Sequence, residues 1–341
     1  MKKIIFYLFI LVVTAGFLAS GWFVFEILNP VKITDDSAFT IKPGEGINQI
    51  SYHLKQRGII KSSFVFETYA YLKDIESQFR EGEYLLPSVI NIKRLVDLLT
   101  VGESTKNLTL LIKEGYTIKD IDAALTGKGN FSAGSFEMAI SKLNQNFLAA
   151  YDFLSDKPAQ VSLEGYLYPD TYYFFSYSTP EDVIRKILAN FNDKLTDELK
   201  TEIKNQGKTI FDIITMASMV EREARVDPQN PGADAKIIAG IFWKRLEAGM
   251  PLQADSTIEY LVGREPTPDD LKKDSPFNTY LYPGLPPQPI CNPSLAAIKA
   301  AIYSQESDYW FFITEQNSAG TVHYAKDFAE HQKNIAEYLK K

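Results

Sequence analysis

The N-terminal segment constrains the fold most, because it is too apolar to be an ordinary surface helix. A run of 22 uncharged residues from Ile4 to Phe25 follows Lys2 and Lys3. As a helix this run would be about 33 Å long, enough to cross the hydrocarbon core of a bilayer. A cleavable signal peptide is the alternative, but its apolar region is normally only about 7–15 residues long. We therefore predict an uncleaved, single-pass membrane anchor in residues 1–30, with the N-terminus in the cytoplasm because of the two lysines.

The chain as a whole has the composition of an ordinary folded protein. The sequence is 45% hydrophobic and 13% aromatic, which excludes general disorder. Its formal net charge of −7 gives no indication of nucleic-acid binding. Cys291 is the single cysteine, so no intrachain disulfide can form and packing must stabilise the domains. The length of 341 residues is enough for two or three domains.

A repeated pattern organises the first half of the chain. Residues 41–58 and 112–129 both read Ile-Lys-x-Gly-x-x-Ile-x-x-Ile-x-x-x-Leu-x-x-x-Gly. The second and third isoleucines and the leucine have i, i+3, i+7 spacing, which places them in one apolar stripe of a helix. Each copy follows a short strand-like run and ends at a glycine suited to a helix C-cap. We therefore predict a strand–turn–helix segment in each copy.

The order of these elements predicts the α+β fold class. After the first copy, the chain continues through a strand to an amphipathic helix that carries Ile92, Leu95 and Leu99. Residues 31–104 are thus expected to form an α+β module, which is similar in pattern to LysM wall-binding modules. Residues 105–341 are expected to form a second, mixed α+β domain. Within it, the repeat-like strand and helix occupy 108–129 and the core occupies about 160–341.

Two glutamates near the end of an apolar helical run, Glu221 and Glu223, are the first candidates for chemistry. Successive residues of a helix turn by about 100°, so these two carboxyls lie about 160° apart and cannot face one scissile bond together. Either could be a carboxyl in an apolar pocket with a raised pKa, which suits a general acid. The helical geometry excludes a paired-carboxylate device made from these two and leaves the choice between them open.

The histidines do not indicate a metal site. His53, His323 and His331 show no metal-ligand spacing to Cys291 or to a carboxylate cluster. The sequence also contains no nucleophile elbow, phosphate-binding loop or dinucleotide fingerprint. We therefore expect neither a metal nor an organic cofactor.

Five sequence blocks together are more specific than any of them alone. They are "EGYLYPDTY" (Glu164–Tyr172), "ASMVEREA" (Ala217–Ala224), "LQADSTIEY" (Leu252–Tyr260), "FNTYLYPGLPPQPICNPS" (Phe277–Ser294) and "YWFFITEQNSAGTVHY" (Tyr309–Tyr324) with "EH" at 330–331. This set, in this order, resembles the YceG-like family of membrane-anchored endolytic murein transglycosylases. The family also begins with a membrane helix followed by a LysM-like module.

The resemblance distinguishes the two glutamates. In lytic transglycosylases of several folds the catalytic glutamate lies in a helix, five residues after an alanine, and a small residue follows it. Ser218, another small residue, and Ala224 occupy these positions relative to Glu223. The resemblance thus implies a helix-borne catalytic Glu223, with Glu221 as a supporting group.

The same resemblance implies the reaction and further site residues. The enzyme would cleave the β-1,4 bond between MurNAc and GlcNAc and form 1,6-anhydro-MurNAc ends with a single carboxyl, thereby terminating or processing glycan strands. The candidates for glycan contacts are Gln253, Asp255, Asn278 and Tyr280. Glu164, Asp170 and Tyr172 are expected to shape the same cleft, and His323 and His331 are further supporting candidates.

The resemblance also implies a location and partners. The expected partners are peptidoglycan glycan strands and the cytoplasmic (inner) membrane, with peptidoglycan synthases as candidate proteins. The catalytic part would lie in the periplasm or the extracellular wall space. Two alternatives stay open: a non-catalytic wall-binding scaffold, and a hydrolytic muramidase in which Asp255 supplies a second carboxylate.

Overall fold

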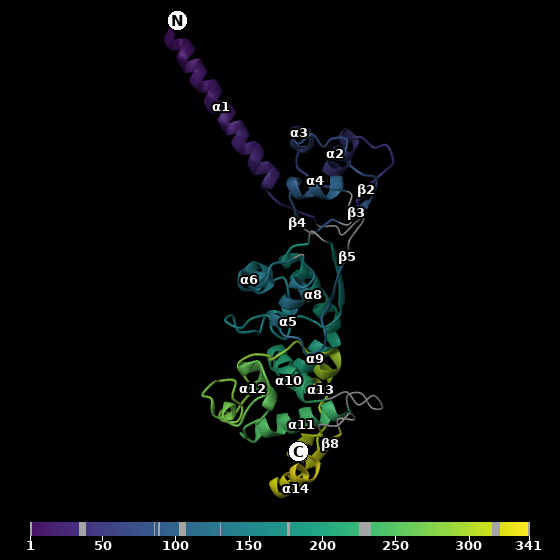
Figure 1. Cartoon of the computed structure of the whole chain (residues 1–341), viewed down its shortest axis with the longest axis vertical. Coiled ribbons are helices and arrows are strands. Elements are labelled where there is room, and N and C mark those ends of the chain that lie inside the picture. The colour runs from purple at the N-terminus through teal and green to yellow at the C-terminus, as the bar shows by residue number, and fades with distance from the viewer. Residues whose placement is uncertain are drawn as a thin grey trace. The chain divides into compact units, whose positions relative to one another are not determined.

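The chain divides into two structural units. The computed structural model describes residues 2–33, 39–84, 86–87, 89–101, 107–129, 131–175, 178–224, 233–315 and 321–339. Unit 1 consists of Met1–Asn107 with Phe175–Ser178, and unit 2 consists of Leu108–Phe174 with Thr179–Lys341 (Figure 1). Both units combine helices with small two-stranded sheets, so the predicted α+β class is confirmed.

Unit 1 is built from four helices and two antiparallel strand pairs in its described residues. The elements are α1 (Lys2–Leu28), β1 (Val31–Lys32), β2 (Phe39–Ile41), α2 (Ile47–Gln56), α3 (Ser63–Leu72), β3 (Gly82–Tyr84), β4 (Val89–Ile90) and α4 (Ile92–Val101). Strand β1 pairs with β4, and β2 pairs with β3. The predicted apolar stripe of α4 is confirmed, because Leu95 and Leu99 are fully buried in the core of this unit. The likeness of unit 1 to a LysM module stays a prediction.

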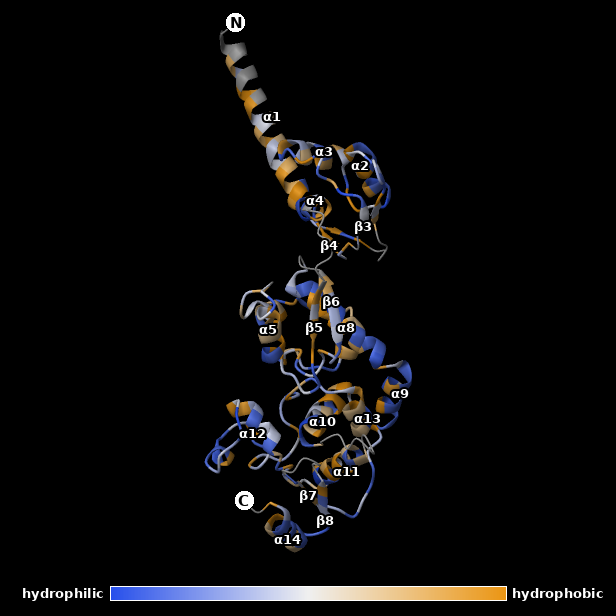
Figure 2. Ribbon diagram, turned by 45° about the vertical axis from the view of Figure 1, so that its right-hand side comes forward, coloured by the Kyte–Doolittle hydropathy of each residue, from blue (hydrophilic) through white to orange (hydrophobic). Residues whose placement is uncertain are grey.

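Helix α1 joins unit 1 at its C-terminal end. Ile27 is buried there, and Phe23 packs against the same core. Toward the N-terminus large apolar side chains are exposed, among them Phe17 and Leu18, and Figure 2 shows the hydrophobic colour along much of the helix. In the described residues no helix is both long enough and apolar enough to cross a membrane.

Both copies of the repeat form a short strand followed by a helix, as predicted. In the first copy β2 leads to α2, and in the second β5 (Asn107–Leu111) leads to α5 (Ile118–Thr126). The shared glycines Gly44 and Gly115 both have a positive φ, 80° and 77°. Glycine adopts this backbone conformation without the penalty that a Cβ brings. The turn between strand and helix therefore explains why both copies have glycine at this position.

Unit 2 contains the remaining elements. They are β5, α5, α6 (Ser135–Ser141), α7 (Gln145–Leu148), the 3-10 helix η1 (Asp152–Leu154), β6 (Thr171–Phe175), α8 (Pro180–Lys194), α9 (Asp197–Asn205), α10 (Ile210–Glu223), α11 (Ala233–Glu247), α12 (Asp255–Val262), η2 (Asp270–Lys272), α13 (Leu295–Ile302), β7 (Phe311–Thr314), β8 (Val322–Ala325) and α14 (Phe328–Tyr338). Strand β5 pairs with β6, and β7 pairs with β8 in antiparallel register. Figure 2 shows α10, α11 and α13 lying between the β5–β6 pair and the C-terminal β7–β8 pair with α14.

Helix α10 lies at the centre of unit 2. Thr209 caps its first turn in a reciprocal arrangement with Asp212, which satisfies the exposed amides at the helix start. The eight residues from Ile213 to Val220 are buried on every side, because α10 packs against α11 and α13 and also contacts α9 and α12. A helix buried all round holds the residues at its C-terminal end in fixed positions.

Candidate active site

The C-terminal end of α10 carries three charged residues in succession. Glu221, Arg222 and Glu223 follow directly after the buried part of the helix. The helix ends at Ala224, whose extended backbone takes the chain away from the helix axis. Because each residue turns by about 100°, the three side chains leave the helix in different directions and meet different partners.

Glu221 supports the neighbouring helix α13. Its carboxylate accepts hydrogen bonds from the backbone N–H of Ser294 at 3.0 Å and from the Ser294 hydroxyl at 2.6 Å. Ser294 is the N-cap of α13, so this carboxylate fixes the start of that helix against the end of α10. Burial raises the pKa of Glu221, while the bonds from Ser294 act in the opposite direction. Its Oε2 atom thus joins two helices.

Glu223 has a different environment. Its side chain is half-buried, and Oε1 accepts the backbone N–H of Ser256 in the first turn of α12 at 3.4 Å. Burial raises the pKa of Glu223; the Ser256 hydrogen bonds lower it, and the carboxylates of Asp255 and Glu259 raise it further. A carboxyl that is buried and close to other carboxylates favours its protonated form, which is the form that a general acid requires.

Asp255 and Tyr280 lie close to Glu223. The Tyr280 hydroxyl donates to Asp255 at 2.7 Å. Burial raises the pKa of Tyr280, and the nearby carboxylates of Asp255 and Glu223 raise it further. Gln253 is exposed, has a positive φ of 52°, and donates its backbone N–H to Thr279 at 3.0 Å. The two segments that carry these residues are therefore joined by hydrogen bonds. Two of the four predicted glycan contacts, Asp255 and Tyr280, therefore lie beside the proposed acid, and Gln253 lies on the segment that leads to Asp255.

Asn278, the fourth predicted glycan contact, lies inside the loop. Its side chain is fully buried and donates to the carbonyls of Leu271 and Lys273 at 3.0 and 2.8 Å. Its amide oxygen accepts the backbone N–H of Tyr280 at 3.0 Å. Asn278 therefore shapes the loop that presents Tyr280 and offers no free polar atom of its own.

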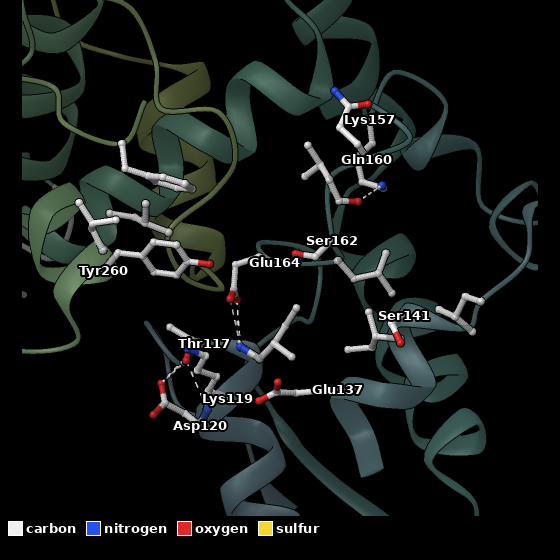
Figure 3. Close-up of a pocket in the computed structure, with 18 of the residues that line it drawn as sticks. Thr117, Lys119, Asp120, Glu137, Ser141, Lys157, Gln160, Ser162, Glu164 and Tyr260 are labelled. Atoms are coloured by element: carbon white, nitrogen blue, oxygen red, sulfur yellow. Dashed lines mark hydrogen bonds between the residues drawn. The ribbon is translucent and has the colours of Figure 1, made fainter. Parts of the chain in front are cut away.

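Glu164 is a buried carboxyl on another wall of unit 2. It accepts the backbone N–H of Ile118, at the first turn of α5, at 3.1 and 3.2 Å (Figure 3). It also accepts the side-chain amide of Asn292 at 3.0 Å. Burial raises the pKa of Glu164 to about 8, and the hydrogen bonds from Ile118 and Asn292 oppose this only in part. Glu164 therefore holds its proton at neutral pH.

A cavity of about 950 Å³ opens in front of Glu164. Parts of α5, α6, the 157–164 segment and α12 line it, and Arg222 and Ser256 border it on the side of Glu223. Of the predicted site residues only Glu164 lines this cavity. Arg222, Tyr260 and Phe277 also line the cavity, and the sequence did not single them out although all three stand in the quoted blocks. Which of their side chains face a common space was not visible without the tertiary structure.

Asp170 and Tyr172 belong to the wall of the sheet and not to this cavity. The buried Tyr172 donates its hydroxyl to the carbonyl of Tyr168 at 2.7 Å. The side chain of Asn190 in α8 donates to Tyr172 and to Asp170, at 3.0 Å in each case. These contacts hold β6 against α8 and so act on the site only through the fold.

The two C-terminal histidines lie in the β7–β8–α14 layer. His323 stacks on the ring of Tyr338 with centroids 3.6 Å apart, and His331 stacks on Phe311 at 5.0 Å. Burial, with a smaller contribution from Arg245, lowers the pKa of His331. Neither histidine lines the cavity. Among the residues with described positions, no three histidines, cysteines or acids form a group that could hold a metal ion.

Comparison with known proteins places the chain in a family. A family model described as the YceG-like family matches residues 39–337, which is most of the chain. The chain belongs to the YceG-like family. A crystal structure of a yceG-like protein from Listeria monocytogenes is similar to this YceG-like chain, with a TM-score of 0.59 and 29% sequence identity, over 88% of this chain and 99% of that one.

Two similar proteins carry a functional name. The endolytic murein transglycosylase of Bacillus subtilis (strain 168) is 30% identical over 327 residues, which cover 92% of this YceG-like chain and 88% of that protein. The endolytic murein transglycosylase of Streptococcus pneumoniae serotype 2 is 30% identical over 362 residues. That alignment covers 98% of this chain but only 64% of the pneumococcal protein.

Proposed function

We propose that this protein is a lytic transglycosylase that cleaves the glycan strands of peptidoglycan endolytically, with Glu223 as its catalytic acid and base. The environment of Glu223 carries the proposal: the carboxyl is half-buried, burial raises its pKa, and its hydrogen-bond partner Ser256 lines a cavity. The names of the Bacillus and Streptococcus relatives supply the substrate class.

The proposed reaction uses one carboxyl. Protonated Glu223 donates its proton to the glycosidic oxygen between MurNAc and GlcNAc as the bond from that oxygen to the MurNAc anomeric carbon breaks. The C6 hydroxyl of the same MurNAc attacks the oxocarbenium-like centre, and the Glu223 carboxylate accepts the hydroxyl proton. The products are a 1,6-anhydro-MurNAc end and a new GlcNAc end, and no water is consumed.

Asp255 favours one alternative, a hydrolytic muramidase. It is exposed, lies next to Glu223, and is held by the Tyr280 hydroxyl at 2.7 Å, so it could activate a water as a second carboxylate. A second alternative is a scaffold that binds the wall without cutting it. The products distinguish the three: hydrolysis consumes one water per cleaved bond and leaves a reducing MurNAc end, transglycosylation leaves an anhydro end, and a scaffold makes no new ends.

We also propose that the N-terminal segment attaches the protein to the cytoplasmic membrane, with units 1 and 2 on the outer side. The uncharged run from Ile4 to Phe25 and the two preceding lysines support this proposal. Peptidoglycan synthases are candidate partners at that location. Labelling of single introduced cysteines by a membrane-impermeant reagent in intact cells tests the orientation, and labelling at residue 2 with none at residue 339 would contradict it.

The test of the activity compares two matched variants of the full chain in detergent. Glu223→Gln removes the acidic proton and keeps the shape, whereas Glu221→Gln can still accept from Ser294. Mass spectrometry of digested glycan strands should show anhydro ends with the natural protein and with Glu221→Gln, and none with Glu223→Gln. An active Glu223→Gln together with an inactive Glu221→Gln would overturn the assignment.

A further inference from the structure

We propose that the cavity in front of Glu164 binds uncharged sugar units of the glycan strand, with Tyr260 and Phe277 as its stacking wall. The inference rests on the proposed function, and it names the binding site that would supply the substrate to Glu223.

The cavity adjoins the proposed acid. Ser256 lines the cavity and at the same time donates its backbone N–H to Glu223. Arg222, the residue before Glu223, borders the cavity as well. A chain bound in the cavity would therefore pass from Tyr260 along Ser256 to the carboxyl of Glu223. At about 950 Å³ the cavity is at the upper end of the size range of small-molecule sites and has room for more than a single sugar.

The wall formed by α12 and the following loop offers aromatic faces. Tyr260 and Phe277 both line the cavity, and their ring centroids are 5.3 Å apart at an angle of 39°. Both side chains are half-buried, so each is fixed by packing and keeps part of its surface accessible. The apolar C–H face of a pyranose can pack on such a ring while its hydroxyls reach polar groups at the edge.

The polar groups around this wall suit hydroxyl and acetamido groups. The Tyr260 hydroxyl points toward Glu164, and it accepts from the side-chain amide of Gln288 at 2.9 Å (Figure 3). Arg222 and Glu259 form an ion pair at 2.5 Å on the same wall. Together these side chains present several directed donors and acceptors beside an aromatic surface, which is the combination that orients a polar ligand in a pocket.

The charges of the lining favour an uncharged ligand. Glu164 holds its proton at neutral pH because burial raises its pKa to about 8. The other charged lining residues are three cations and three carboxylates: Lys119, Lys157, Arg222, Asp120, Glu137 and Glu259. With these in balance, the cavity has no excess charge to attract a polyanion or a peptide with several carboxylates. Sugar units without a charged substituent match both this balance and the aromatic wall.

The test measures binding apart from cleavage. The full chain carrying Glu223→Gln is titrated with the uncharged hexamer of N-acetylglucosamine, and binding is followed by calorimetry at pH 7. In this background Tyr260→Ala should weaken binding roughly ten-fold through loss of the stacking face, whereas Tyr260→Phe should change it less than about three-fold. Tyr303→Ala, which truncates an exposed tyrosine of unit 2 outside the cavity, is the matched control and should not affect binding.

A second variant keeps the test valid if Tyr260→Ala does not fold. Ser141→Trp introduces a large side chain into the cavity from an exposed position on α6 and should abolish hexamer binding without disturbing the core. Hexamer binding that persists in Ser141→Trp, or strands that bind only when they carry peptides, would overturn the inference. Failure of the proposed function gives a different result, namely anhydro products from Glu223→Gln while the hexamer still binds through Tyr260.

Discussion

Glu164→Gln removes the buried carboxyl while keeping the size and planarity of the side chain. The glutamine oxygen can still accept from the Ile118 amide and from Asn292, which are the hydrogen-bond partners of Glu164 in the structure. The substitution therefore changes the titration of this site more than its packing. We expect the main effect of the substitution to be on the pH dependence of the free energy of unfolding.

The direction and size of this effect on the free energy of unfolding follow from the raised pKa of Glu164. Burial raises the pKa of Glu164 from 4.5 to about 8. Between these values the folded protein keeps a proton that the unfolded chain has released, so the contribution of Glu164 to stability is complete at low pH and is lost as the pH rises toward 8. The full loss is of the order of 4–5 kcal/mol at most. Glu164→Gln has no carboxyl to titrate, so it should not lose this contribution. Its free energy of unfolding should therefore rise relative to that of the natural protein as the pH rises.

Urea unfolding of both proteins at pH 5, 6, 7, 8 and 9 measures the effect. Trp243 and Trp310, which lie in unit 2, report on the unfolding of the unit that contains Glu164. The difference in free energy of unfolding, variant minus natural protein, should increase by a few kcal/mol across this range. Glu137→Gln, at an exposed carboxyl of the same cavity, is the control and should leave the difference constant. Parallel pH profiles for the Glu164→Gln and natural proteins would refute the reasoning.

Three further predictions concern contacts around the site. Ser294→Ala removes the hydroxyl that donates to Glu221 and caps α13, so the free energy of unfolding should fall by about 1–2 kcal/mol, and its effect combined with Glu221→Gln should be less than additive in urea titrations. Asp122→Ala leaves two backbone amides at the start of α6 without their acceptor and should cost about 1–3 kcal/mol, with partial recovery in Asp122→Asn. Gly240→Ala would place a Cβ 2.0 Å from the carbonyl oxygen of Gln305, so a loss of about 3 kcal/mol or more is expected, and an unchanged melting temperature would contradict it.

Periodicity predicted local structure correctly where one face of a helix determines burial. The stripe of α2 shows this, since Ile50 and Leu54 are completely buried. The repeated glycines at 44 and 115 are explained by the same logic, because a left-handed turn must join strand to helix in both copies. These features depend on residues close together in the sequence, and so a single sequence contains the information for them.

The separation of the two glutamates was also predictable, but their roles were not. Helical geometry alone places Glu221 and Glu223 on different sides of α10. Their partners, Ser294 and Ser256, come from segments that are distant in sequence and reach α10 only through the packing of unit 2. Glu223 is singled out by its motif, and the activities of the two glutamine variants test that choice.

The sequence by itself determined the α+β class, the strand–helix repeats and the family, because periodicity, glycine positions and ordered motifs are local properties. Only the tertiary structure decided how the motif residues divide between surface and interior. It buries Asn278 within a loop, exposes Asp255 beside Glu223, and turns Tyr260 toward Glu164 across a cavity. The physical reason is that burial and facing direction depend on which helices pack together, and contacts between distant segments are not encoded in the spacing of any one of them.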